Sequence, residues 1–319
     1  MNPYTLTTPV ALMVFNRPET TARVFSAVRE SRPTHLLIVS DGPRPGVEGE
    51  AARCAEVRNI VEQVDWPCLV QKNYSQVNLG CGVRMATGIS WVFDQVGEAI
   101  ILEDDCLPHP SFFRYCQELL ERYRDDERVM HIAGSNALVR SAKGTGSYYF
   151  SMFPHCWGWA SWRRAWRNYD FNLDALSEAE VNGWLDGVLP DRLDAMYWLD
   201  KLRAVQKEKF TWDYQWTFAC WTSSGLSIMP NDCLISNIGF GADATHTKDA
   251  GHPLAFMPIA EMEFPLLHPP FVMRDADADA ITQRIILTSN TLTFWLLKLK
   301  RLLTVISRVR RSSRRQVGG

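Results

Sequence analysis

Three consecutive carboxylates, Glu103, Asp104 and Asp105, directly follow the apolar run at residues 99–102. The unbroken run predicts a strand buried on both faces, because a half-exposed strand would alternate apolar and polar residues. Three neighbouring acids repel one another, and a divalent cation, or ribose and sugar hydroxyls, would relieve that repulsion. Ligands of open parallel sheets sit at the carboxyl ends of the strands. The acidic triplet is therefore a candidate ligand site, although taken alone it is also typical of a solvated acidic turn.

A further acid, Asp213, lies between tryptophans in the segment 210–216. We expect Thr211 to cap a helix that runs to about Ser223, which places Asp213 in the first turn, where the helix dipole favours a carboxylate. This position explains the acid without any catalysis. A carboxylate is also a suitable base for accepting the proton of an attacking hydroxyl, so Asp213 is a candidate for that role as well.

The first hundred residues predict a scaffold for these acids by alternating strands and helices. Strands are expected at 9–15, 35–40, 68–71 and 99–102, and helices at about 18–30, 50–64 and 80–95. This alternation predicts an α/β fold with a Rossmann-like, mostly parallel sheet flanked by helices.

Polar or glycine-containing segments follow every predicted strand. We expect one edge of the sheet to carry, besides the triplet, Asn16, Arg17, Asp41, Arg44, Asn78, Gly80 and Arg84. Such an edge suits a nucleotide: Asp41 would accept from a base or ribose, Gly80 would permit close backbone approach, and Arg84 would face a diphosphate. Taken singly, Asp41, Asn78 and Gly80 are equally typical of turns. No GxGxxG follows the first strand and no GxxxxGK[ST] occurs, which disfavours dinucleotide and P-loop sites.

Four motifs follow one another in this half: Asn16-Arg17-Pro18, Ser40-Asp41-Gly42, Asn78-Leu79-Gly80 and Glu103-Asp104-Asp105. Their order resembles the nucleotide-binding half of GT-A glycosyltransferases. The triplet is similar to that of inverting N-acetylglucosaminyltransferases and of family 2-like bacterial glycosyltransferases. The resemblance implies that Asp105 binds Mn²⁺ or Mg²⁺, that Asp104 contacts the ribose and Glu103 the donor sugar, and that the other edge residues complete the donor site. Oxygen ligands suit either metal independently.

Nine of the twelve tryptophans lie between Trp157 and Trp221. Aromatic rings stack on the flat faces of sugars, although an aromatic core is the alternative for most of them. Trp157-Gly158-Trp159 loosely resembles the acceptor loop of the same transferases, and Trp212-Asp213 resembles the segment with their catalytic base. Tyr214 stands where that pattern has a second acid. The resemblance implies an acceptor site with Trp157, Gly158, Trp159 and Trp212.

A glycine-rich loop at 239–247 contains His246. In many GT-A enzymes a mobile loop supplies a histidine to the metal or diphosphate, so the resemblance makes His246 a candidate second metal ligand. A surface histidine is the alternative.

The C-terminal region is basic, with eight Lys and Arg from Lys298 onward and no acid, whereas the net charge of the chain is −2. The acidic remainder argues against nucleic-acid binding. An amphipathic helix expected at about 290–311 would lie on an anionic membrane surface, with self-association through a heptad seam as the alternative.

The eight cysteines show no CxxC or metal-ligand spacing, which predicts reduced thiols. The N-terminus lacks the pattern of a signal peptide, and no apolar run reaches membrane-spanning length. We therefore expect a cytoplasmic protein, peripheral on the inner face of the membrane if the basic helix binds lipid.

We predict a single GT-A-like domain at 1–270, with a nucleotide-binding half (8–105) and an acceptor-binding half (106–250), followed by an extension at 271–319.

The predicted function is inverting, metal-dependent transfer of a hexosyl or N-acetylhexosaminyl group. The donor would be a nucleoside diphosphate sugar, UDP-linked, and the acceptor a hydroxyl of a glycan or lipid-linked saccharide, as in cell-surface polysaccharide synthesis. One alternative is a sugar-1-phosphate nucleotidyltransferase, which residues 15–18 disfavour because they form no glycine-rich basic loop. The other is a non-catalytic carbohydrate-binding protein.

Overall fold

The computed structural model describes residues 4–136, 138, 146–189, 191–240 and 259–288. Its strands are β1 Val10–Val14, β2 His35–Ser40, β3 Leu69–Tyr74, β4 Glu98–Glu103, β5 Cys106–Pro108, β6 Val129–Ala133, β7 Tyr148–Ser151, β8 Trp159–Trp162, β9 Leu226–Pro230 and β10 Ile235–Asn237. Its helices are α1 Pro18–Ser31, α2 Glu50–Val61, α3 Cys81–Gln95, α4 Ser111–Arg122, α5 Arg163–Trp166, α6 Leu176–Val181, α7 Trp184–Val188, α8 Arg192–Glu208, α9 Asp213–Thr222 and α10 Ala276–Thr288.

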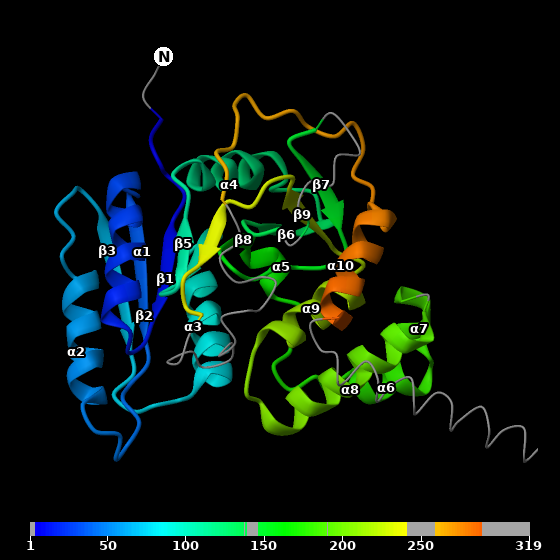
Figure 1. Cartoon of the computed structure of the whole chain (residues 1–319), viewed down its shortest axis with the longest axis horizontal. Helices are drawn as coiled ribbons and strands as arrows, with labels where there is room; N and C mark the ends of the chain where they lie inside the picture. The colour runs from blue at the N-terminus through cyan, green and yellow to red at the C-terminus, as the bar shows by residue number, and fades with distance from the viewer. Residues whose placement is uncertain (1–3, 137, 139–145, 190, 241–258, 289–319) are drawn as a thin grey trace, which may run out of the picture.

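One eight-stranded sheet, in the order β3-β2-β1-β4-β8-β6-β9-β7, runs through the molecule (Figure 1). The strands β3, β2, β1 and β4 are all parallel, as the alternation of strands and helices predicts. Beyond β4 the sheet is mixed, because β8 pairs antiparallel with both β4 and β6, and β7 pairs antiparallel with β9. The predicted α/β fold with a large Rossmann-like sheet flanked by helices is confirmed, with its parallel part confined largely to the first half of the chain.

Helices cover both faces of the sheet. One face packs on α1, α2 and α4, with Val10, Leu12 and Ile100 pointing toward them. The opposite face packs on α3, α5 and α9, with Ala11 and Ile101 pointing toward those. Successive residues of a strand thus enter two different cores, which explains the continuous apolar runs of β1 and β4.

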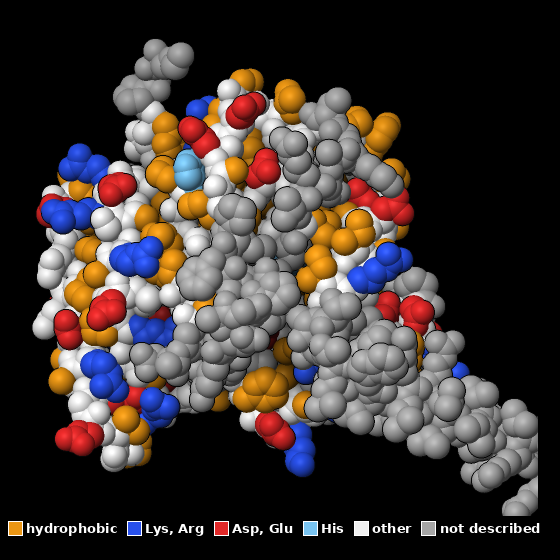
Figure 2. Space-filling view, viewed as in Figure 1, with side chains coloured by type: hydrophobic (Ala, Val, Ile, Leu, Met, Phe, Trp, Pro, Cys, Tyr) orange, Lys and Arg blue, Asp and Glu red, His pale blue; other side chains and the backbone are white. Residues whose placement is uncertain are grey.

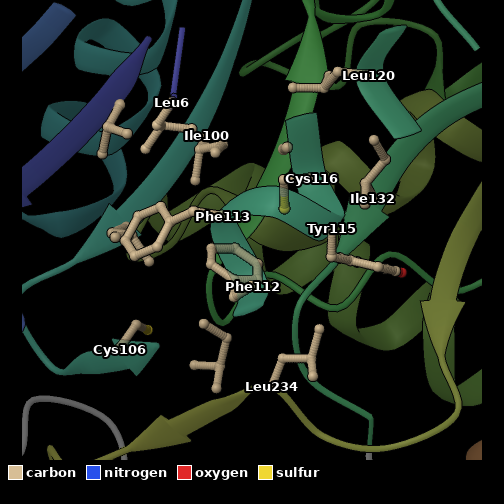
Figure 3. Close-up of a cluster of buried hydrophobic side chains, with 14 of the residues drawn as sticks. Leu6, Ile100, Cys106, Phe112, Phe113, Tyr115, Cys116, Leu120, Ile132 and Leu234 are labelled. Atoms are coloured by element: carbon tan, nitrogen blue, oxygen red, sulfur yellow. The ribbon is translucent and has the colours of Figure 1, made fainter. Parts of the chain in front are cut away.

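The strand β4 is buried on both faces as predicted, since its residues 99–102 are all fully buried. On one side α4 supplies the partners: Figure 3 shows Phe113 and Cys116 gathered near Ile100 and Leu6. An amphipathic helix such as α4 buries one stripe of side chains in this way. The strand that carries the acidic triplet is therefore fixed rigidly from both sides.

Two smaller clusters extend the fold beyond the central sheet. The helices α6, α7 and α8 pack with α9 and with Met152 and Phe153. Helix α10 docks on β7 and β9, where Asp279 is buried and accepts from the Ser151 hydroxyl at 2.5 Å and the Met152 backbone amide at 3.2 Å. Among the described residues, none of the helices has the length and apolar character needed to cross a membrane.

The surface shown in Figure 2 mixes charges of both signs over α1 and α2, where Lys and Arg lie among Asp and Glu. Such a mixture differs from the basic stripe of a nucleic-acid-binding face. The predicted metal ligand His246 and the predicted amphipathic helix at about 290–311 lie outside the described residues.

Candidate functional site

The carboxyl ends of four strands meet at one edge of the sheet. In the pairing register, Met13 of β1 lies opposite Glu103 of β4, Val14 lies opposite Ser40 of β2, and Ser40 lies opposite Tyr74 of β3. The segments that follow these strands therefore start side by side, as expected for a parallel sheet.

The acidic triplet is held between the ends of β1 and β10. The backbone amide of Phe15 donates to Asp104 Oδ2 at 3.0 Å, and Arg17 Nη1 lies 2.9 Å from Asp105 Oδ2. On the other side, the backbone amide of Ile238 donates to the Asp105 carbonyl at 2.8 Å. Gly239 packs so closely on Asp105 that an added β-carbon would lie 2.7 Å from its Cβ. Contacts far apart in the sequence thus fix the triplet.

The triplet carries more negative charge than its surroundings compensate. Burial, reinforced by Asp105, raises the pKa of Asp104 to about 7, against the opposing effects of Arg17 and the Phe15 amide. Burial and then repulsion by Asp105, Asp104 and Asp213 raise the pKa of Glu103 well above its usual range. A bound cation would relieve this repulsion.

Asp213 lies close enough to act on the triplet electrostatically, although 108 positions separate it from Asp105. It is the first residue of α9, and its Oδ1 accepts from the Thr211 hydroxyl at 2.5 Å. The predicted cap is therefore wrong in detail: Thr211 binds the Asp213 side chain, and Trp212 occupies the N-cap position. Asp213 is partly exposed, so a ligand can reach its side chain.

A helix contact shows how the two acidic segments come together. Gly82 in the first turn of α3 packs against the backbone before α9, where an added β-carbon would lie 3.0 Å from the Thr211 carbonyl oxygen and closer still to that of Lys209. The neighbouring Cys81 thiol has its pKa raised to about 12 by burial and then by carboxylates that include Glu103 and Asp213. The start of α3 thus lies close to both the triplet and the segment that leads into Asp213. Sequence reasoning missed both residues, because a glycine and a cysteine at a helix start form no pattern that is specific to a site.

Asp41 organises the loops that surround it. Its Oδ1 accepts from the backbone amides of Gly42 at 2.8 Å and Leu79 at 2.9 Å, and its Oδ2 accepts from Gly80 N and Asn78 Nδ2, both at 3.1 Å. These bonds use most of the acceptor capacity of a carboxylate. Asp41, Asn78 and Gly80 are together at the edge, as predicted, but here their polar groups face one another. Gly80 has φ +78°, a conformation that favours glycine.

The structure corrects the prediction for Arg84. Its guanidinium is buried, and its Nη2 donates to both the carbonyl and the side-chain oxygen of Asn73. An arginine held in this way ties α3 to β3 and does not face a diphosphate. The prediction failed because it placed a helical residue by its distance from the strand end and not by the face of the helix it occupies.

Glu50, which sequence reasoning missed, links Asn16 and Arg44. It is fully buried at the start of α2, where it accepts from Asn16 Nδ2 at 2.8 Å and pairs with Arg44 Nη2 at 2.5 Å. The hydrogen bond from Arg44 is the main reason that the pKa of Glu50 is lowered to about 2. Both predicted donor residues therefore lie at the edge but are engaged with this carboxylate.

The aromatic residues divide into core and surface. Trp159 is 0% exposed and Trp212 is 3% exposed, and their rings stack on each other with centroids 5.6 Å apart. Their predicted role as acceptor contacts is wrong, because neither ring has a free face for a sugar. Trp157 is partly exposed and meets Phe240 edge to face at 5.7 Å. Gly158 joins the two with φ +58°.

A divalent cation fits the donor set of the triplet, although no cage of three or more His, Cys, Asp or Glu side chains occurs among the described residues. The Asp105 side chain is 20% exposed and offers hard oxygen ligands. Mg²⁺ is commonly held by one or two carboxylates, with water and substrate phosphates completing its shell. The site thus suits a metal that arrives together with an anionic ligand.

No protein-family model matches this chain, and no curated protein matches its sequence. The solved structures that it resembles include a UDP-glucose pyrophosphorylase complexed with UDP-glucose, with a TM-score of 0.30 and 10% identity over 51% of this chain and 78% of that one. An apo-UDP-glucose pyrophosphorylase has a TM-score of 0.36 and 10% identity over 72% and 93% of the two chains. The 4-diphosphocytidyl-2C-methyl-D-erythritolsynthase from Anaerococcus prevotii DSM 20548 has a TM-score of 0.32 and 8% identity over 51% and 75%. At these TM-scores the likeness carries no argument about function.

Proposed function

We propose that this protein is an inverting, metal-dependent glycosyltransferase of the GT-A type. The donor is a nucleoside diphosphate sugar, UDP-linked, and the acceptor is a hydroxyl of a glycan or lipid-linked saccharide. The observation that carries the proposal is the electrostatic repulsion between Asp213 and Glu103, which brings a further carboxylate close to the acidic triplet. A carboxylate near a cluster that could hold a metal suits proton abstraction beside a charged leaving group. A purely structural acid at a helix start would not need this neighbour.

Each acidic residue has a separate role in the proposed reaction. Asp105 would hold Mn²⁺ or Mg²⁺, and such an ion would offset the charge of the diphosphate leaving group. Asp104 and Glu103 accept hydrogen bonds from the ribose and the donor sugar. Asp213 takes the proton of the acceptor hydroxyl as its oxygen attacks the anomeric carbon, while Thr211 holds the other carboxylate oxygen in place.

The acceptor side of the proposed site rests on Trp157. Its ring is partly exposed and belongs to the loop between β7 and β8. An aromatic ring in this position suits the apolar face of a saccharide. The buried Trp159 and Trp212 belong to the core on the other face of the sheet and make no contact with the acceptor.

The proposal is tested by nucleoside diphosphate release from UDP-sugars with Mn²⁺ and saccharide acceptors. Asp213→Asn should lower turnover by roughly 10²–10⁴, the usual contribution of a general base, while donor binding persists. Asp105→Asn should abolish the metal dependence of binding. Asp125→Asn is the matched control, since Asp125 is exposed and precedes β6 at the opposite edge of the sheet.

Three results would contradict the proposal. Turnover that survives in Asp213→Asn would remove the base from the mechanism. Release of pyrophosphate from a nucleoside triphosphate and a sugar 1-phosphate would identify a nucleotidyltransferase instead. Saccharide binding without any turnover would identify a carbohydrate-binding protein.

A further inference from the structure

The imidazole of His131 lies between the helix that begins at Asp213 and the loop that contains Trp157. His131 of β6 is fully buried, with Nε2 3.0 Å from the His155 carbonyl oxygen and Nδ1 3.1 Å from the Trp216 indole nitrogen. A carbonyl only accepts and an indole N–H only donates, so the proton is on Nε2 and Nδ1 is the acceptor. Burial lowers the pKa of His131 to about 3, consistent with a neutral ring.

On the loop side, β6 holds the backbone before and after Trp157. The His155 carbonyl accepts from His131, and the Gly158 carbonyl accepts from the Gly134 backbone amide at 2.8 Å. An added β-carbon at Gly158 would lie 2.5 Å from Ile235 Cδ1, so this end of the loop packs closely on β10 and leaves no room for a side chain. Hydrogen bonds on both sides of Trp157 therefore hold the loop that presents this ring at the surface.

On the helix side, the bond from Trp216 fixes the first turn of α9. Trp216 lies three residues after Asp213, almost one helical turn, and is fully buried. The imidazole also stacks on Trp159, with centroids 5.0 Å apart and an interplanar angle of 16°. Rotation of α9 about its axis would break the hydrogen bond from the Trp216 indole to His131. This hydrogen bond therefore sets the direction in which the Asp213 side chain leaves the helix.

We propose that His131 is a positioning residue that sets the base and the acceptor loop relative to each other through its two ring nitrogens. This inference rests on the function proposed for Asp213 and Trp157. It predicts that the two hydrogen bonds have separable effects. The bond from Nε2 to the His155 carbonyl should affect acceptor binding, and the bond from Trp216 to Nδ1 should affect the orientation of the Asp213 carboxylate.

Three substitutions separate the two bonds. His131→Asn keeps an acceptor near the Nδ1 position and loses the donor to His155. His131→Gln keeps a donor near the Nε2 position and loses the acceptor for Trp216. His131→Phe keeps the stacking on Trp159 and loses both. The matched control is His35→Asn, since His35 hydrogen-bonds Gln71 at the start of β2, away from the site.

We expect His131→Asn to raise the acceptor KM by about tenfold with acceptor-independent donor hydrolysis unchanged, and His131→Gln to lower kcat by about tenfold with acceptor KM unchanged. These factors correspond to the loss of one hydrogen bond. His131→Phe should show both effects, and His35→Asn neither. Equal effects of the Asn and Gln variants on KM and kcat would reduce His131 to a structural role.

Hydrogen exchange tests the positioning without turnover. Exchange should accelerate at residues 152–158 in His131→Asn and in the first turn of α9 in His131→Gln. Uniform acceleration in both variants, or none in either, would overturn the inference even if the proposed chemistry is correct. Absence of turnover in the wild type, with the two exchange effects separated, would instead overturn the proposed function alone.

Discussion

The contact between Gly82 and the backbone before α9 makes a direct prediction for Gly82→Ala. The added β-carbon would lie 3.0 Å from the Thr211 carbonyl oxygen and closer to that of Lys209. Both obstacles are backbone atoms, so no side chain can rotate away to make room. The start of α3 and residues 209–211 would have to separate.

Two opposing effects set the size of the change. Overpacking of this kind costs typically about 1–3 kcal/mol. The higher helix propensity of alanine offsets up to about 1 kcal/mol of this cost. We expect the free energy of unfolding to fall by about 1–2 kcal/mol, and Tm to fall by several degrees for a domain of this size. Transfer should decrease as well, because the displaced segment leads into Asp213.

Urea and thermal unfolding measure the first effect, and release of nucleoside diphosphate measures the second. Gly97→Ala is the matched control, since Gly97 follows the same helix and no atom lies within 4 Å of its added β-carbon. Equal stability and turnover in Gly82→Ala and Gly97→Ala would refute the packing of α3 on the Asp213 segment. A loss of stability with unchanged turnover would refute the functional consequence alone.

Three further predictions concern other parts of the chain. Glu50→Gln should lower the unfolding free energy by about 2 kcal/mol at neutral pH. Because the pKa of Glu50 is lowered from 4.5 to about 2, this difference should shrink as pH falls from 4.5 toward 2, and a pH-independent difference in urea titrations would contradict the assignment. Gly158→Ala should lower the unfolding free energy by roughly 2–3 kcal/mol, because Gly158 has φ +58° and the added β-carbon clashes with Ile235. Gly46→Ala should cost less, since Gly46 has a positive φ but open space around it. Equal costs of the two substitutions would exclude the clash. Deletion of 290–319 should move the protein from the membrane fraction to the supernatant with donor hydrolysis intact, and unchanged fractionation would rule out the membrane role.

The parallel part of the fold could be predicted from sequence because its signals are local. The strands β1, β2 and β4 contain apolar runs bounded by turn residues, whereas β3 is the largely polar edge strand. A helix connects each strand to the next, as parallel pairing requires. The insertion of β8 between β4 and β6 depends on pairing between residues far apart, such as Ile101 with Trp159, which no local pattern encodes. Ser111 is of a residue type typical of helix caps, but Pro110 is the N-cap of α4 and the Ser111 hydroxyl accepts from the Met262 backbone amide.

The candidate site could be predicted only in part, for related reasons. The acidic triplet and the other strand ends share an edge because parallel register brings them together. Trp159 and Trp212 were misassigned because composition does not distinguish a core aromatic from a saccharide platform. The role of Glu50 required knowledge of which cation and amide lie against it, and that of His131 required two partners at distant positions.

The most direct test of the central claim is ligand binding to the acidic edge. Thermal unfolding is measured with nucleoside diphosphates and their sugars, with and without Mn²⁺, on the wild type, Asp105→Asn and Asp125→Asn. A ligand at about 100 times its Kd stabilises a protein by roughly 2.7 kcal/mol, which corresponds to a shift of several degrees. We predict a metal-dependent shift with one nucleotide, lost in Asp105→Asn and retained in Asp125→Asn. No shift with any of these ligands, in folded protein, would contradict both the donor site and the metal site.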